Sequence, residues 1–127
     1  GDLNTDGTLD IVLGDQLGGG VWLYLGRDGT SFEERLQIGN PADNAYSLAL
    51  ADLNSDGTLD VVIGNRGAPG AVLTNNGSGV SFTRTPFGDA QGTTYGLAIG
   101  DVNGDGAPDI VAGRSGAQNT LYLGRMR

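Results

Sequence analysis

Most of the side chains that could do chemistry lie in three nine-residue segments of nearly the same sequence. The segments read DLNTDGTLD from residue 2, DLNSDGTLD from residue 52 and DVNGDGAPD from residue 101. Each has Asp at its first, fifth and ninth positions, Asn at its third and Gly at its sixth, and together they hold nine of the 15 acidic residues. Metal-free hairpin turns would also favour Asp, Asn and Gly, but they would not require these residues at one spacing three times.

Calcium is the cation that these oxygens suit best. It takes about six to eight oxygen ligands, and the backbone carbonyl of the seventh position would join the four side chains of each loop. We therefore predict one Ca²⁺ in each loop. The predicted ligands are Asp2, Asn4, Asp6, Thr8 and Asp10 in the first loop, Asp52, Asn54, Asp56, Thr58 and Asp60 in the second, and Asp101, Asn103, Asp105, Ala107 and Asp109 in the third.

Two other cation sites fit the sequence less well. An EF-hand needs a bidentate Glu at the twelfth position and flanking helices. The residues at that position are Leu13, Ile63 and Ala112, each in a short apolar run. Magnesium is disfavoured because it demands a smaller and stricter octahedron that keeps several waters.

The loops belong to a longer internal repeat, with periods of 50 and 49 residues between successive loops. IVLG after the first loop matches VVIG and IVAG after the others, and LYLGR at residues 23–27 returns at residues 121–125. YSLALADLN from Tyr46 similarly matches YGLAIGDVN from Tyr95. Such a period indicates stacked structural units, which we place at residues 1–50, 51–99 and 100–127.

The elements that must position the loops are short β-strands. The 24 glycines mark frequent turns, and the apolar runs between them are short and rich in Val, Ile and Leu. In the most complete unit we expect strands at residues 46–52, 59–64, 70–75 and 80–87. The second strand of each unit is almost continuously apolar, which predicts cover on both faces. Four antiparallel strands in about 50 residues are typical of a β-propeller blade, so we predict an all-β fold.

The strand count predicts about two and a half blades. The first unit starts at its loop and lacks an opening strand, and the third ends before a closing strand, which leaves three, four and three strands. Residues 1–127 would then form one partial propeller. The remaining blades of a longer chain or further copies of this one would cover its ends.

These residues resemble the FG-GAP and VCBS repeats found in integrin α subunits and in many bacterial secreted proteins. The loop pattern DxNxDGxxD followed by an apolar strand carries the resemblance, together with Phe87-Gly88 and the GAP letters at residues 67–69. Residues 18–20 read GGG and residues 116–118 read GAQ instead, so the chain is more similar to the bacterial type. The resemblance implies that each loop joins the first and second strands of a blade and holds one Ca²⁺.

Composition excludes several classes of function. The chain has no His, Cys or Lys, so it lacks the residues of common nucleophile–base pairs and of zinc sites. A net charge of −8 argues against nucleic acid and anionic membranes, and no apolar run is long enough to span a bilayer. We do not expect an enzyme. The six acids outside the loops are interpreted as solvated surface: Asp15, Asp28, Glu33, Glu34, Asp43 and Asp89.

Trp22 and Tyr24 share one face of a strand and could stack on a sugar, although packing between blades is the simpler role because Tyr122 recurs at the place of Tyr24. We therefore expect an extracellular, secreted or cell-surface module with a structural or adhesive role toward a protein. The alternatives are a lectin-like propeller with a glycan ligand and a scaffold segment of a secreted polysaccharide-degrading enzyme.

Overall fold

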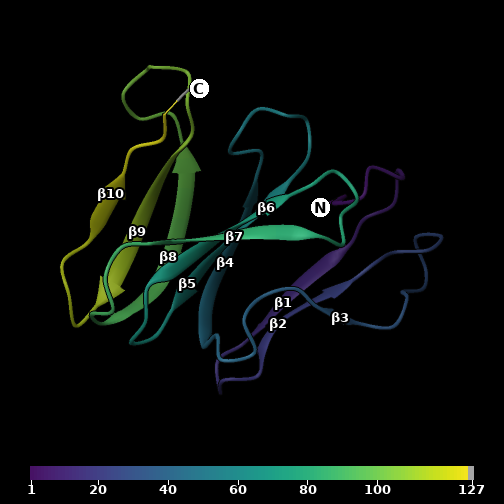
Figure 1. The fold of residues 1–127 in the computed structure, drawn as a ribbon, viewed down its shortest axis with the longest axis horizontal. Helices are drawn as coiled ribbons and strands as arrows, with labels where there is room; N and C mark the ends of the chain where they lie inside the picture. The colour runs from purple at the N-terminus through teal and green to yellow at the C-terminus, as the bar shows by residue number, and fades with distance from the viewer. Residues whose placement is uncertain (126–127) are drawn as a thin grey trace.

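The computed structural model describes residues 1–125 of the 127, so the two final residues of the predicted third unit lie outside the described part. It shows ten β-strands and no helix in those residues, and therefore no helix that could span a membrane (Figure 1). The strands form three antiparallel sheets of three, four and three strands. The predicted all-β class and the small antiparallel sheets are confirmed.

Within each sheet the strands follow one another in sequence order, so every connection joins two neighbouring strands. Sheet 1 contains β1 (Ile11–Asp15), β2 (Gly20–Tyr24) and β3 (Leu36–Gln37). Sheet 2 contains β4 (Ala45–Ala51), β5 (Asp60–Asn65), β6 (Gly70–Asn75) and β7 (Phe82–Phe87). Sheet 3 contains β8 (Thr93–Gly100), β9 (Asp109–Ser115) and β10 (Thr120–Tyr122).

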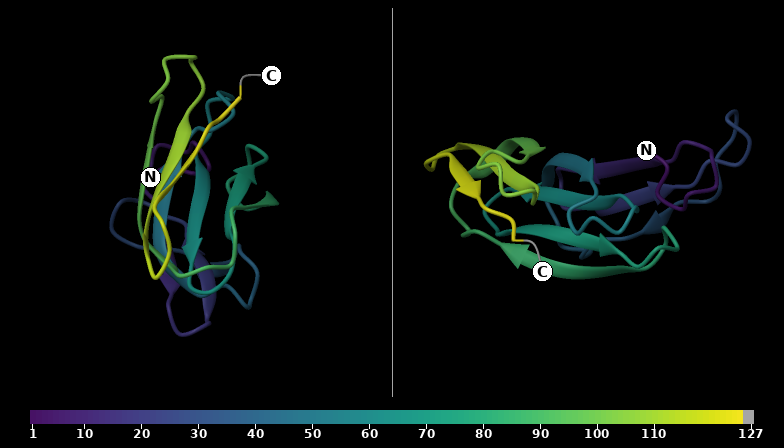
Figure 2. Two further views of the ribbon diagram at one scale, coloured as in Figure 1. Left: turned by 90° about the vertical axis from the view of Figure 1, so that its left-hand side faces the viewer. Right: turned by 90° about the horizontal axis from the view of Figure 1, so that it is seen from above.

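Sheet 2 lies between the other two, as Figures 1 and 2 show. Its strands β4 and β5 contact β8 of sheet 3, and β4 also contacts β1 of sheet 1. The main apolar cluster lies between sheets 1 and 2, where side chains of both sheets are removed from water. Its buried members are Leu3, Val21, Leu23, Leu25, Ala45, Val61, Ile63 and Leu73.

The prediction that every second strand is covered on both faces holds for β5 alone. All six residues of β5 are buried. In sheet 1, however, Ile11 and Leu13 of β1 are 43% and 52% exposed, and Val111 of β9 in sheet 3 is 37% exposed. The reason is position in the stack, because within residues 1–125 the two outer sheets have a neighbour on one face only.

Glycine in the repeated IVLG and VVIG runs allows the next sheet to approach closely. A Cβ added at Gly14 would lie 2.8 Å from the Cβ of Ala45, and one at Gly64 would lie 2.7 Å from Cγ2 of Thr94. Both neighbours belong to the first strand of the following sheet. The glycines therefore set the spacing between sheets, which in turn places the three loops.

Candidate metal centres

The three predicted loops have closely similar backbones. The second loop connects β4 to β5, the third connects β8 to β9, and the first leads into β1. The glycine at the sixth position has a positive φ in every loop, +87° at Gly7, +89° at Gly57 and +87° at Gly106. The sharp turn predicted at this glycine is therefore present, because side-chain-bearing residues rarely adopt that conformation.

The fourth position also has a left-handed backbone, which the sequence did not reveal. Its φ is +57° at Thr5 and +59° at Ser55, and +75° at Gly104 in the third loop. Non-glycine residues adopt such angles at an energetic cost, so the surrounding loop must hold them there. The only sequence signal was Gly104 at this position of the third loop, and a single glycine was not enough to predict the angle in the other two loops.

The aspartate at the first position organises the loop backbone. In the second loop, Asp52 accepts hydrogen bonds from the backbone N–H of Asp56 at 3.1 Å and from that of Gly57 at 2.8 Å. Asp2 and Asp101 accept the equivalent two bonds in their own loops. A carboxylate that satisfies consecutive amides in this way folds the chain around itself and keeps lone pairs for a further partner.

The aspartate at the fifth position is exposed and bonded locally. Oδ1 of Asp56 accepts bonds from the N–H of Thr58 at 2.9 Å and from its hydroxyl at 2.7 Å, and Oδ2 accepts one from Nδ2 of Asn54 at 3.1 Å. The hydroxyl and N–H of Thr58 hold the pKa of the Asp56 carboxyl below its usual value. The pKa of Asp6 is lowered in the same way by Thr8. In the third loop, the backbone N–H of Ala107 still donates to Asp105 at 2.9 Å without a hydroxyl.

The aspartate at the ninth position is buried and joins the loop to the sheet. Asp60 is fully buried, and it accepts bonds from the backbone N–H of Leu53 at 2.8 Å and of Asn75, at the end of β6, at 2.9 Å. Burial raises the pKa of its carboxyl against the lowering effect of those two amides, and the nearby carboxylates of Asp56 and Asp52 raise it slightly further. Asp10 and Asp109 make the equivalent pair of bonds in the other loops.

The asparagine at the third position provides the test of whether these loops suit a cation. Oδ1 of Asn4 is buried and has no hydrogen-bond partner, although buried polar atoms are nearly always satisfied. Its equivalents in the other loops accept only long bonds, 3.3 Å at Asn54 and 3.2 Å at Asn103. An oxygen-binding cation would satisfy the Asn4 oxygen, so the residues fit Ca²⁺ in donor type and in this unpartnered atom.

The carboxylates themselves are brought together only in part. Within residues 1–125 no group of three or more acidic side chains lies close enough to hold a metal ion. The acids at the first and fifth positions face the loop amides, and the ninth lies beneath them against the sheet, where its two oxygens already accept backbone bonds. The structure thus places all the predicted ligand residues in three equivalent loops without closing a carboxylate cluster.

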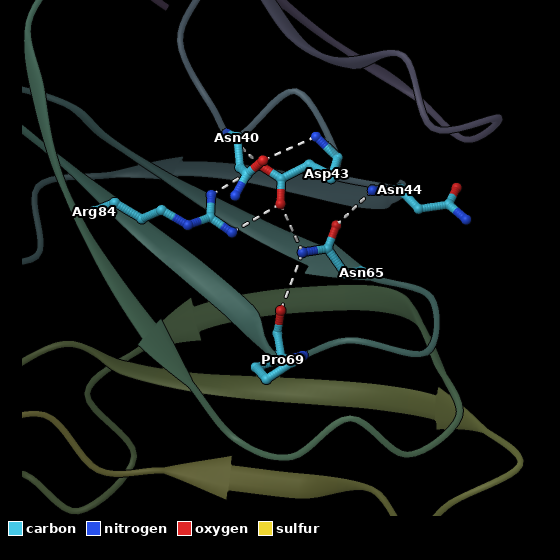
Figure 3. A network of polar contacts seen from close by, with 7 residues as sticks. Asn40, Asp43, Asn44, Asn65, Pro69 and Arg84 are labelled. Atoms are coloured by element: carbon cyan, nitrogen blue, oxygen red, sulfur yellow. Dashed lines mark hydrogen bonds and ion pairs between the residues drawn. The ribbon is translucent and has the colours of Figure 1, made fainter.

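Among the six acids outside the loops, Asp43 was wrongly predicted to be solvated surface. It is 4% exposed and forms a bidentate ion pair with Arg84, with both N–O distances at 2.8 Å (Figure 3). It also accepts bonds from Nδ2 of Asn65 at 3.1 Å and from the backbone N–H of Asn40 at 2.9 Å. Asp43 lies between β3 and β4, so this network joins the segment that leaves sheet 1 to strands β5 and β7 of sheet 2.

The first loop is also connected to sheet 2. Nδ2 of Asn75 donates to the carbonyl oxygen of Leu3 at 2.8 Å, and a Cβ added at Gly79 would lie 2.7 Å from the backbone of Asn4. The turn after β6 therefore covers the back of the first loop. Anything that orders this loop also acts on the contact between two sheets.

Comparison with known families agrees with this repeat geometry. A model of the FG-GAP-like repeat matches residues 2–63 and again residues 52–112, so each match contains two of the three loops. No curated protein and no solved structure matches the chain. The two family matches together cover residues 2 to 112 of the 127. Because they cover far more than half of the sequence, and because the strands and loops repeat with them, the chain belongs to the FG-GAP-like repeat family.

Proposed function

We propose that this repeat module, of the β-propeller type, binds one Ca²⁺ in each loop and acts outside the cell in a structural or adhesive role toward another protein. The observation that carries the calcium proposal is the buried Oδ1 of Asn4, which lacks a partner in a loop that also holds the carboxylates of Asp2, Asp6 and Asp10. The same residue types occupy two further loops of the same shape.

Charge supports the proposal. Each loop holds three carboxylates in nine residues, and their mutual repulsion opposes folding unless a cation neutralises it. Three divalent ions would reduce the net charge from −8 to −2. Bound calcium would neutralise the carboxylates at the first and fifth positions and would satisfy the Asn oxygen. Asp10, Asp60 and Asp109 would transmit that order to the sheets through their backbone bonds.

The expected affinity supports an extracellular location. Calcium sites in extracellular modules have dissociation constants of about 10⁻⁴ to 10⁻³ M, so they bind more weakly than intracellular calcium sensors. Sites built from the first- and fifth-position carboxylates and an amide would be occupied where calcium is plentiful. A binding role rather than catalysis is supported by a sequence without His, Cys or Lys and by the repeat family itself.

Calcium titration of the whole chain tests the metal proposal. With a dissociation constant of about 10⁻⁴ M and calcium near 10⁻³ M, each site would add about 1.4 kcal/mol and three sites about 4 kcal/mol to the free energy of unfolding. Calorimetric titration should give three sites per chain, and chelator should lower the melting temperature. An unchanged melting temperature in chelator would contradict the proposal, and a magnesium titration at the same concentration is the control.

The adhesive role needs its own test. The calcium-loaded chain should be applied to immobilised extracellular-matrix proteins and, in parallel, to a glycan array. Binding to a matrix protein that is lost in chelator is the expected result. Binding to glycans alone would favour the lectin-like alternative instead.

A further inference from the structure

One face of sheet 1 has the residues of a core but stays partly exposed within residues 1–125, where Ile11 is 43% and Leu13 52% exposed. Leu13 of β1 pairs with Trp22 of β2, and Ile11 pairs with Tyr24, so the four side chains lie on one face. Val21 and Leu23, which alternate with them on β2, are buried against sheet 2. We call the face formed by Ile11, Leu13, Trp22 and Tyr24 the open face.

Hydrogen bonds give the equivalent positions in the three sheets. The backbone N–H groups of Gly26, Asn75 and Gly124 each donate to the ninth-position aspartate of their own loop. Counting back from these residues, Trp22 is equivalent to Ala71 and Tyr24 to Leu73.

The other strand gives the same correspondence. Counting from the loops, Ile11 is equivalent to Val61 and Leu13 to Ile63. The pairings agree, because Val61 pairs with Leu73 and Ile63 with Ala71.

In sheet 2 these four positions are a buried interface. Val61, Ile63 and Ala71 have no exposed surface and Leu73 is 1% exposed. Val61, Ile63 and Leu73 pack with Val21 and Leu23 of sheet 1. In sheet 3 the residue equivalent to Tyr24 is Tyr122, whose ring packs edge-on against Phe87 of sheet 2 at 4.9 Å. The open face therefore occupies the position that is covered by a preceding sheet in both other sheets.

An arginine marks the same correspondence at the edge of this face. Gln37 pairs with Trp22, and Pro86 pairs with the equivalent Ala71. Arg35 and Arg84 each lie two residues before these partners, so they are equivalent positions of the repeat. Arg84 binds Asp43, which belongs to the segment that leaves the preceding sheet (Figure 3).

Arg35 has no such carboxylate within residues 1–125, where the ion pairs are those of Arg84 and Arg114. Its guanidinium carbon instead lies 4.0 Å from the centre of the Trp22 ring. Around it is a groove of about 430 Å³ whose lining includes Leu13, Tyr24 and Tyr46. An arginine whose guanidinium lies over an aromatic ring can still bind a carboxylate with two hydrogen bonds through its N–H groups.

We propose that the open face docks another blade of the same repeat type, and that Arg35 binds an aspartate in the segment leaving that blade. The internal precedent fixes the chemistry of the partner: aliphatic side chains such as Val21 and Leu23 to cover the face, and a carboxylate in the place of Asp43. This inference depends on the repeat fold and not on calcium, so it can fail without affecting the metal proposal.

Two extended chains test the docking. The first adds a copy of residues 1–50 before Gly1, which is in register because Gly1 stands where Ala51 follows Leu50. Its added Trp22 is changed to Phe, so that the original Trp22 is the single tryptophan. The second adds residues 51–99, which contain no tryptophan and have Gly92 at the place of Asp43. In both, the emission of Trp22 should shift to shorter wavelength and its quenching by acrylamide should fall several-fold relative to the 127-residue chain.

The two extensions also separate cover from ion pairing. In the first, Arg35→Gln of the original chain and Asp43→Asn of the added copy should couple by about tenfold in the unfolding equilibrium constant, within the range for contacting pairs. The second should protect Trp22, but Arg35→Gln should change its unfolding equilibrium constant less than in the first, because Gly92 offers no carboxylate at the place of Asp43. The Arg84 and Asp43 pair of the original chain, tested by the same double-mutant cycle, shows that sheet 2 is folded and sets the scale.

Several results would overturn the proposal. One is that Trp22 stays as accessible in both extended chains as in the original while the Arg84 control is intact. Another is that Arg35 and the added Asp43 show no coupling in the first extended chain. Protection of Trp22 in the 127-residue chain with rising protein concentration would assign the face to a second copy. Protection by oligomers of hexuronic acid would assign it to an acidic glycan.

Discussion

The buried and the exposed carboxylates of this chain have different roles, although the local sequence does not distinguish them. Asp60 and Asp43 are removed from water, and every bond they make is to a group that would otherwise be unsatisfied or charged. Asp56 is exposed and bonds to nearby groups that water could serve equally well. The buried acids hold the sheets together, whereas the exposed acids of the loops keep lone pairs that a cation could use.

The contrast is sharpest inside a single loop. Asp56 and Asp60 are four residues apart, yet the pKa of Asp56 is lowered by hydrogen bonds from Thr58 and that of Asp60 is raised by burial. Removing the Asp56 carboxylate should affect cation binding, and removing the Asp60 carboxylate should affect folding.

Replacing Asp60 by Asn should have the largest effect. The substitution keeps the shape but turns one acceptor into a donor that faces the backbone N–H of Leu53 or Asn75. A buried clash of this kind costs about 3 kcal/mol of unfolding free energy. Denaturant unfolding in chelator measures it without calcium, and Asp56→Asn under the same conditions should cost less than about 0.5 kcal/mol. Equal losses from the two variants would remove the distinction between buried and exposed acids.

Asp43→Asn should cost about 2 kcal/mol, below the usual loss from breaking a buried ion pair because the Arg84 side chain is 32% exposed. The matched variant is Asp89→Asn, which breaks the pair with Arg114. The Asp89 side chain is 54% exposed and that of Arg114 is 8% exposed, but the Nε of Arg114 also donates to the carbonyl of Gln118, so the loss should be smaller, about 1 kcal/mol. Thermal unfolding of both variants checks the order, and a larger loss at Asp89 would reverse it.

Asp56→Asn should cost about 1.4 kcal/mol when calcium is present near 10⁻³ M, because one of three sites is lost. Calorimetric titration should then count two sites. The control is Thr58→Ala, which removes a hydroxyl bond but leaves the backbone in place, as Ala107 does naturally in the third loop. Loss of a site in Thr58→Ala would show that the hydroxyl, and not the carbonyl, is the ligand.

The smallest effect is expected from Asp28, in the turn after β2. Hydrogen bonds from the hydroxyl and N–H of Thr30, and from Ser31, lower the pKa of its carboxyl to about 2. A lowered pKa in the folded state stabilises the protein above the ordinary pKa of 3.8, and this contribution is lost as the pH falls towards about 2. An NMR titration should give a midpoint near 2, and Thr30→Val should raise it. A midpoint at the ordinary value would show that the turn is open in solution.

Part of this architecture could be predicted from local sequence. The alternation of apolar runs with Gly, Asn and Asp gave the all-β class, and the strand at residues 70–75 was located to the residue. The shape of each loop followed from its glycine at the sixth position, since a positive φ is a property of one residue. The left-handed angles at Thr5 and Ser55 escaped prediction because neither residue type prefers them, and only the closed loop imposes them.

The repeat, the strand-forming segments and the oxygen-rich loops could be predicted from the sequence, because each depends on residues close together in the chain. Which acids are buried depends on contacts between residues far apart in the chain. Asp43 and Arg84 are 41 residues apart, and Asp60 meets the N–H of a residue 15 positions later at the end of β6. No local pattern distinguishes such an aspartate from one in water. Its environment is set by the neighbouring strand or sheet. Among residues 1–125, no sheet covers the open face of sheet 1, whereas one covers the same positions of sheet 2.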